Sequence, residues 1–328
     1  MRSSMNAKYS MLRCPVCREK LKPMTQYAVV CACDTYPVIR DIVYLKKNKA
    51  KDNALGYLSR GRIRAATIAL LDSRRFLNYL VAFVPHLPLT WLFAIAALCF
   101  PSGKAWWRYL ANRDRRITHI LSLATIGAIQ KNDTVVDICC GTGNFLARAS
   151  LWSRASRCVG IDASFFLLLL ARLQYVPLRV LLVCADVNLG LPIHSQTVNR
   201  AYLNDCFMYI HQKPMMNELR RILTSRGDAF LTHVHNRGKH NIGQGRGVSP
   251  STLRSSTVTT ISDKQLFAHI RNNTNIIYQK VSDSVYDHPS YSYRISSNLT
   301  RKPLPIPPQL SVLVKQIPID FTEDTWLQ

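Results

Sequence analysis

The chain is poor in acidic residues. Its 328 residues include 19 Asp and Glu against 43 Lys and Arg, so the net charge is +24 and the isoelectric point is near 10. Such an excess indicates contact with an anionic partner, either nucleic acid or a membrane surface. Simple solubility, or a basic proteome, is the alternative explanation of the charge.

Two other common features are missing. Met1–Cys14 is polar and has no apolar stretch, which argues against a secretory signal. The ten cysteines do not read as a disulfide framework, because Cys139, Cys158 and Cys184 lie in predicted buried strands. We therefore expect a cytoplasmic, reducing location, with peripheral attachment to a membrane left open. No internal repeat is visible, and 48% apolar residues suffice for the core of one large or two small domains.

A third glycine is missing from the most informative motif. Thr134–Cys139 is an apolar, β-branched run that predicts a buried strand, and Gly141 and Gly143 follow it in a tight turn before a helical pattern. A dinucleotide-binding turn needs G-x-G-x-x-G, but Leu146 occupies the third position. Asp137 inside the strand end would repel a phosphate. The turn therefore favours S-adenosylmethionine, which has a positively charged methionine part and no phosphate.

Two more acids end predicted strands. Cys158–Asp162 is a short strand whose final carboxylate is suited to binding two ribose hydroxyls. Val180–Asp186 is a third strand, and its terminal acid is placed to accept from an adenine amino group. The order strand, helix, strand, helix, strand with an acid at each strand end indicates a nucleoside ligand.

On these motifs, residues 133–235 resemble the core of a class I S-adenosylmethionine-dependent methyltransferase. The resemblance implies an α/β fold with a Rossmann-like seven-stranded sheet. An unrelated doubly wound α/β domain is the alternative. The cofactor-binding residues that the resemblance implies are Asp137, Gly141, Thr142, Gly143, Asp162, Ala163, Ala185, Asp186, Val187 and Asn204.

The amino-terminal segment carries four cysteines. Cys14 and Cys17 form a Cys-Pro-x-Cys pair of the kind that binds zinc from a tight turn, and Cys31 and Cys33 form a Cys-x-Cys pair. Residues 11–46 resemble the Trm112-like zinc-ribbon family, which implies a small β-rich module that acts as a scaffold. The Cys-x-Cys spacing departs from the family pattern, so Zn²⁺ and a module that has lost its metal both stay open.

A basic and hydrophobic segment separates this module from the core. The 22 residues 79–100 have no charge, but Pro85 and Pro88 interrupt them. A membrane-surface hairpin, a buried cap over a hydrophobic substrate and a transmembrane helix are the three interpretations. We divide the chain into a zinc-ribbon-like module at 1–46, a helical linker or cap at 47–116 and a methyltransferase domain at 117–328.

The remaining pattern completes the predicted sheet. Helices are expected near 112–129, 213–224 and 261–271, and Lys46–Lys51 is read as a basic linker. The fourth to seventh strands are expected at 197–204, 228–234, 275–281 and 310–317. In the family that the core resembles, the seventh strand is inserted antiparallel.

Two histidines are predicted to act in catalysis. His211 follows the fourth strand and His235 ends the fifth, where a general base could serve a hydroxyl or acidic carbon acceptor. Local capping by His211 is an equal alternative, and His233 is expected to be packed. Asn204-Asp205 does not match the Asn-Pro-Pro-Tyr motif that marks amino methylation of adenine or glutamine, which argues against those two targets.

The acceptor stays open between two classes. The hydrophobic segment favours a small, hydrophobic or aromatic acceptor that is methylated on oxygen or carbon, in the manner of the ubiquinone-biosynthesis-like methyltransferases. The charge of +24 favours ribosomal or transfer RNA instead. A membrane-associated protein of this fold without catalysis is the third interpretation.

Overall fold

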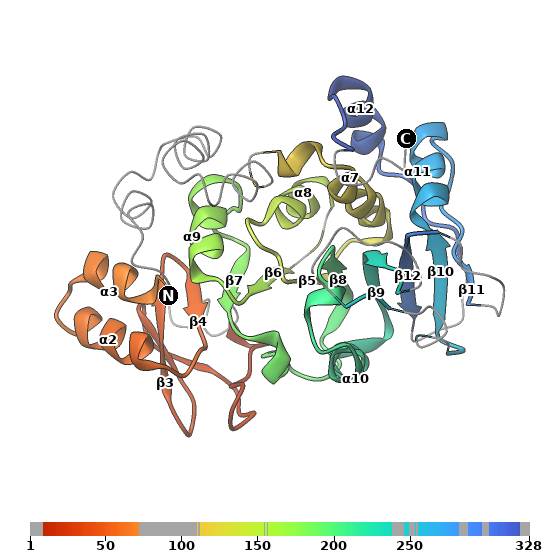
Figure 1. Ribbon diagram of the computed structural model, residues 1–328. Helices are drawn as coiled ribbons and strands as arrows, with labels where there is room; N and C mark the ends of the chain where they lie inside the picture. The colour runs from red at the N-terminus through yellow and green to blue at the C-terminus, as the bar shows by residue number, and fades with distance from the viewer. Residues whose placement is uncertain are drawn as a thin grey trace. The chain divides into compact units, whose positions relative to one another are not determined.

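The computed structural model describes residues 9–71, 110, 112–153, 155, 157–237, 246–248, 253, 255–281, 288–296 and 302–321. Its contacts divide the chain into two compact units. Figure 1 labels the helices and strands along the chain. The first unit contains residues 1–111, 139–147 and 159–194, and the second contains 112–138, 148–158 and 195–328. The predicted division into three successive domains stays a prediction.

The first unit is built on a mixed sheet. Four short amino-terminal strands form an antiparallel meander: β1 (Lys22–Thr25), β2 (Ala28–Val30), β3 (Thr35–Ile39) and β4 (Ile42–Tyr44). β4 then pairs in parallel with β7 (Leu181–Cys184), which pairs in parallel with β6 (Arg157–Asp162). The β-rich amino-terminal segment thus continues the sheet that carries two of the predicted acids.

Apolar packing fixes this continuation. Tyr44 of β4 is fully buried and meets Phe165 edge to face, with ring centroids 5.9 Å apart. Phe165 begins α9 (Phe165–Gln174), whose amino terminus is capped by Ser164. Burying an aromatic side chain of this kind contributes about 1.5–3 kcal/mol.

A helix replaces the predicted basic linker. α2 (Lys49–Leu58) begins inside Lys46–Lys51, because Asn48 caps its amino terminus by accepting from the Lys51 amide. Lys51 is buried and forms an ion pair with Asp34. α2 and α3 (Ile63–Leu70) both pack against β3. The lysine-rich composition predicts an exposed linker, but the segment contains the start of a helix because the buried Lys51 is paired with Asp34.

The second unit contains the strands that follow β6 in the sheet order, beginning with β5. β5 (Thr134–Ile138), β8 (Val198–Asn204) and β9 (Leu223–His235) run parallel, and β12 (Ser290–Ser296) lies antiparallel between β9 and β10 (Val258–Ser262). The short β11 (Gln279–Lys280) pairs with β10. The predicted α/β fold, with parallel strands and one inserted antiparallel strand, is confirmed. The helices of the second unit are η2 (Arg113–Arg115), α7 (Ile117–Ala124), η3 (Thr125–Ala128), η5 (Phe207–Tyr209), α10 (Gln212–Ile222), α11 (Asp263–Asn272) and α12 (Pro308–Gln316).

Two of the predicted strands are wrong. The inserted strand is β12 rather than residues 310–317, which belong almost entirely to α12. Apolar residues at 310, 313, 314 and 317 follow helical spacing, and proline at the first turn suits a helix start. The predicted sixth strand at 275–281 is reduced to β11, and β10 takes the expected place beside the inserted strand.

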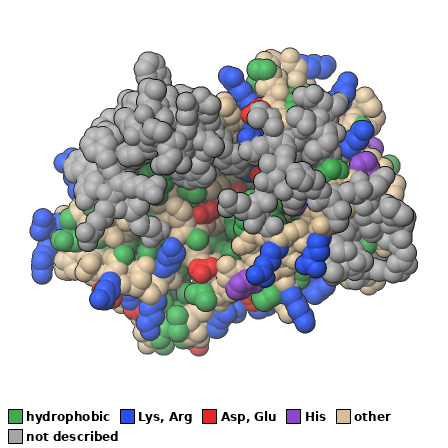
Figure 2. Space-filling view, in the orientation of Figure 1, with side chains coloured by type: hydrophobic (Ala, Val, Ile, Leu, Met, Phe, Trp, Pro, Cys, Tyr) green, Lys and Arg blue, Asp and Glu red, His purple; other side chains and the backbone are tan. Residues whose placement is uncertain are grey.

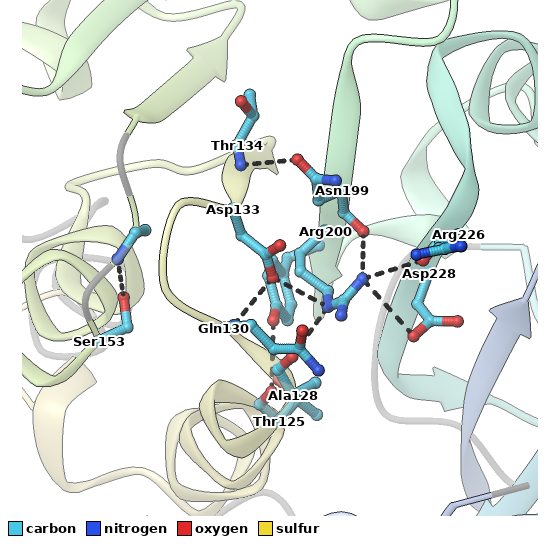
Figure 3. Close-up of polar contacts among 12 residues, drawn as sticks. Thr125, Ala128, Gln130, Asp133, Thr134, Ser153, Asn199, Arg200, Arg226 and Asp228 are labelled. Carbon is cyan, nitrogen blue, oxygen red and sulfur yellow. Dashed lines mark hydrogen bonds and ion pairs between the residues drawn. The ribbon is translucent and has the colours of Figure 1, made fainter.

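Buried charges hold the base of this sheet together (Figure 3). Arg200 of β8 donates from Nε to the Ala128 carbonyl at 2.8 Å and lies 3.4 Å from Asp133 and 3.8 Å from Asp228. Arg294 of β12 pairs with the same Asp228 at 3.0 Å. Both of these buried guanidinium groups therefore have an acidic partner, which lowers the cost of burying their charge.

The predicted hydrophobic segment 79–100 lies outside the described residues. Within the part of the chain that the structure describes, no helix is both long enough and apolar enough to cross a membrane. On the face drawn in Figure 2, the described surface shows more Lys and Arg than Asp and Glu side chains. This distribution follows the net charge of +24.

Candidate functional site

The glycine turn in the first unit has the backbone that the motif predicts. Gly141 and Gly143 have φ of 54° and 73°, and Cys139 shares the left-handed region with φ of 59°. A Cβ added at Gly141 would meet no atom within 4 Å, whereas at Gly143 it would lie 2.5 Å from Val176 Cγ2. Gly143 is thus needed for packing, and Gly141 leaves open space above the turn.

Asp162 at the end of β6 ties the turn to the sheet. Its Oδ2 accepts from the Gly141 amide and its Oδ1 from the Ser164 amide, both at 2.8 Å. Burial raises the pKa of this carboxyl above its usual range, and the two amide hydrogen bonds oppose that rise. Each carboxylate oxygen can accept more than one hydrogen bond, so the side chain can still accept from hydroxyls.

The third acid lies beside the second at the same sheet edge. Asp162 of β6 pairs in register with Cys184 of β7, and the Ala185 amide donates to the Asp162 carbonyl at 2.9 Å. Asp186 caps the short η4 (Val187–Leu189) by accepting from the Asn188 amide at 3.0 Å. The predicted residues Ala163, Ala185, Asp186 and Val187 therefore all follow the carboxyl ends of these two strands, while Thr142 is bonded to Asn144 inside the turn.

The predicted residues Asp137 and Asn204 of the second unit belong to a buried, hydrogen-bonded group. Asp137 at the end of β5 accepts from Asn204 Nδ2 at 3.3 Å, and Asn204 Oδ1 accepts from the Thr232 hydroxyl at 2.8 Å. β5, β8 and β9 are thereby joined by side chains at one edge. The Asn204 amide orients the Asp137 carboxylate.

Beyond this group lies a cluster of Asp205, His233 and His235. The three side chains each offer a donor atom, and these atoms lie within 4.8 Å of one another. Asp205 Oδ2 pairs with Arg113 Nη1 at 3.1 Å, and the two imidazole rings meet edge to face at 4.8 Å. Burial, helped by the neighbouring His233, lowers the pKa of His235 to about 4, so this ring is neutral at physiological pH.

His211 is placed differently from His235. It is exposed and forms the N-cap residue of α10, without a side-chain hydrogen bond to that helix. Among the described residues, the donor cluster contains His235 but not His211.

The sequence pattern did not identify Asp205 and Asp263 as candidate site residues. Asp263 is fully buried and lies 2.9 Å from His233 Nδ1, and it also accepts from Ser292 at 2.7 Å. His233 is packed as expected, but against a carboxylate. The alternation of His233 and His235 along the strand was the signal in the sequence from which this cluster could have been predicted.

The four amino-terminal cysteines come together as predicted. Their sulfur atoms all lie within 4.8 Å of one another, with Cys14 to Cys33 at 3.6 Å and Cys31 to Cys33 at 3.5 Å. A tetrahedral zinc site with Zn–S bonds of about 2.3 Å places sulfurs roughly 3.8 Å apart. Burial raises the pKa of the Cys14 thiol, but hydrogen bonds with Tyr36 and backbone amides outweigh it and bring the pKa to about 7. The residues Cys14, Cys17, Cys31 and Cys33 therefore fit Zn²⁺.

The fold is α/β, with acidic residues at the carboxyl ends of parallel strands, which is the edge where sheets of this kind bind ligands. Residues 135–227 match the family model described as a methyltransferase domain. The chain thus carries a methyltransferase domain over this segment, as the sequence predicts. None of the curated proteins matches the chain.

Several solved structures are similar to parts of the chain. One is a chain from a complex between the Haloferax volcanii Trm112 methyltransferase activator and a methyltransferase. That chain is 23% identical to this one, and the similar region covers 40% of this chain and 57% of that chain, with a TM-score of 0.35. An S-adenosylmethionine-dependent methyltransferase from Mesorhizobium loti is 20% identical, over 35% and 53%, with a TM-score of 0.32. The plantazolicin methyltransferase BpumL in complex with SAH is 13% identical, over 68% and 100%, with a TM-score of 0.44. The chain spans little more than half the length of the first two.

Proposed function

We propose that the chain is an S-adenosylmethionine-dependent methyltransferase. The observation that carries this proposal is the methyltransferase-domain match over residues 135–227, which contains the glycine turn bound to Asp162. Bound S-adenosylmethionine supplies a methyl group that its sulfonium has already activated. The protein then needs mainly to hold the donor and acceptor in line.

Gly141, Asp162 and Asp186 would hold the cofactor in the first unit. The open space at Gly141 admits a ligand against the backbone, and Asp162 accepts hydroxyls at its edge. Asp186 is half-buried one strand away, where it can accept from an amino group. The roles of Asp137 and Asn204 toward the cofactor, and of Thr142, Gly143, Ala163, Ala185 and Val187, stay predictions from the motif.

The amino-terminal module would act as a scaffold for this cofactor face. β4 pairs with β7 along Ile42–Tyr44, and the Leu45 amide donates to the Cys184 carbonyl at 2.8 Å. Cys184 is in register with Asp162. Zinc bound by the four cysteines would stabilise the module and take no part in the transfer.

The acceptor is proposed to be small and hydrophobic or aromatic. This proposal depends on the uncharged segment 79–100, which precedes the first core strand. RNA is the second candidate, and the net charge of +24 favours it. His211 and His235 are the proposed general bases, and the neutral ring of His235 is in the form that can accept a proton.

Substitution of Asp162 tests the cofactor site. We expect Asp162→Ala to weaken S-adenosylmethionine binding, since each hydrogen bond lost to a charged group costs about 1.5–3 kcal/mol, or roughly 10- to 150-fold in affinity. Asp162→Asn keeps one acceptor oxygen and should lose less. Asp52→Ala removes an exposed carboxylate in the same unit and serves as the control. If calorimetry shows that all three variants bind the cofactor as tightly as the parent does, the assignment of Asp162 to the cofactor site is wrong.

A transfer assay identifies the acceptor class. The full chain is incubated with methyl-labelled cofactor and a lysate separated into lipid, small-molecule and RNA fractions. We expect label in the lipid or small-molecule fraction. Label confined to RNA and suppressed by salt would favour the second candidate, and cofactor binding without label in any fraction would favour a non-catalytic role.

A further inference from the structure

The cluster of Asp205, His233 and His235 has the composition of a metal site. Two imidazoles and one carboxylate are the donor set of many transition-metal centres that keep open coordination positions. Their donor atoms lie within 4.8 Å of one another. Ligand atoms about 2.0–2.2 Å from one ion lie at most about 4.4 Å apart, so small side-chain rotations would let one ion bind all three.

The cluster lies where ligands bind in parallel α/β sheets. β8 and β9 are adjacent and parallel, and Asn204 pairs in register with Thr232, so Asp205 and His233 follow at the same carboxyl edge. Both residues have left-handed backbone, with φ of 55°. Residues held in this region at strand ends are often functional, because the conformation costs about 1–3 kcal/mol and needs a surrounding that enforces it.

A second carboxylate orients His233. Asp263 is 0% exposed and lies 2.9 Å from His233 Nδ1, so that Nδ1–H donates to it and Nε2 has the ring's lone pair. Metal-binding histidines usually donate their other N–H to a carboxylate in this way. Ser290 and Ser292 donate to the same Asp263 and fix it in turn.

The ion pair between Arg113 and Asp205 is compatible with metal binding by the cluster. Its guanidinium binds Asp205 Oδ2 at 3.1 Å, and the carboxylate has a second oxygen for an ion. Ligating carboxylates are themselves commonly hydrogen-bonded. Arg113 would then hold the carboxylate in position.

We propose that Asp205, His233 and His235 bind a divalent transition-metal ion of the Zn²⁺ or Co²⁺ class, separate from the cysteine cluster. Asp263 acts as the positioning residue for His233. His235 is then a metal ligand, and His211 is left as the proposed general base. Binding of the ion does not depend on the proposed methyl transfer.

The test must separate this site from the four thiols. The parent for the test is therefore the full chain carrying Cys31→Ser and Cys33→Ser, which removes half of the sulfur ligands from the amino-terminal module. Titration of this protein with Co²⁺, followed by calorimetry and visible absorption, is expected to show one ion per chain with no sulfur charge-transfer band.

Single substitutions then assign the ligands. Asp205→Asn keeps a residue that tolerates left-handed backbone, and His235→Gln replaces a half-buried ring. Substitutions of residues that only hydrogen-bond to a metal ligand typically weaken metal binding by roughly 10- to 100-fold. Each of these two ligand substitutions is expected to raise the Kd for Co²⁺ by at least that factor. His269→Gln, in α11 and bonded to Thr274, is the matched control and should leave the Kd unchanged.

Two outcomes would overturn the proposal. One is the absence of Co²⁺ binding in the cysteine-substituted parent, and the other is a Kd that neither Asp205→Asn nor His235→Gln changes. The melting temperature of each variant is measured with and without the ion. A cluster with only a structural role would lower the metal-free value and give no metal-dependent rise in the parent. Metal binding without methyl transfer would instead contradict the proposed function alone.

Discussion

The two glycines of the turn allow a matched pair of substitutions. Gly141→Ala and Gly143→Ala both place a side chain in left-handed backbone, at φ of 54° and 73°. That conformation costs an L-residue about 1–2 kcal/mol. The two positions differ in their surroundings, since a Cβ at Gly141 meets nothing within 4 Å and a Cβ at Gly143 would lie 2.5 Å from Val176 Cγ2 and 3.1 Å from Ala171 Cβ.

Stability and cofactor binding should therefore separate between the two variants. Overpacking adds about 1–3 kcal/mol at Gly143, so Gly143→Ala is expected to cost about 2–5 kcal/mol and Gly141→Ala about 1–2 kcal/mol. Gly141→Ala is expected to lose more cofactor affinity for each kcal/mol of stability lost, because its methyl group fills the open space above the turn.

Urea unfolding and calorimetry with S-adenosylmethionine provide the two readouts. Equal losses of stability in the two variants would refute the packing argument. Undiminished cofactor affinity in Gly141→Ala would refute the use of the open space. Ala147→Gly in α8 (Asn144–Trp152), the helix that follows the turn, is the reference substitution, and it should cost about 0.5–1 kcal/mol for the backbone and about 0.8 kcal/mol for the buried methyl group.

Two further substitutions test the second unit. Arg200→Met removes the buried guanidinium that pairs with Asp133 and should lower the free energy of unfolding by about 3–5 kcal/mol in urea. Arg226→Met, at an exposed position, is the control and should change stability little. Equal losses in the two variants would contradict a stabilising role for the Arg200 ion pairs. Burial lowers the pKa of His119 to about 3, so between that pH and its usual 6.5 the unfolded chain binds a proton that the folded chain does not. Stability is then lost as the pH falls through this window, by about 2 kcal/mol between pH 6.5 and pH 5, and His119→Phe should flatten that slope in pH-dependent thermal unfolding.

Local order along the chain explains why the cofactor side was predictable. Asp162 ends β6, and the turn that it binds follows β5 directly, so each candidate cofactor residue adjoins a strand that its own composition predicts. The four cysteines were predictable for the same reason, since metal ligands of one type are visible as pairs. The Cys-x-Cys spacing seemed unfavourable, yet the turn after β2 brings Cys31 and Cys33 to within 3.5 Å.

The inserted strand was hidden by its polar residues. β12 alternates Ser290, Ser292 and Arg294 with Tyr291, Tyr293 and Ile295, but six of its seven residues are buried. A strand buried on both faces is expected to be apolar throughout, and the alternating serines do not fit that pattern. They are tolerated because Asp263 and Asp228 accept their hydrogen bonds and those of Arg294.

The cluster of Asp205, His233 and His235 depends on contacts that no local pattern contains. Asp263 starts a helix thirty residues after His233, and a fully buried carboxylate is costly unless donors surround it. Those donors come from β9 and from β12, which lies between β9 and β10 in the sheet. A shift of β12 by one residue would turn its serines away and present tyrosines to Asp263. The register of the inserted strand therefore determines whether His233 has an oriented imidazole, and with it whether the two histidines and Asp205 can act as one site.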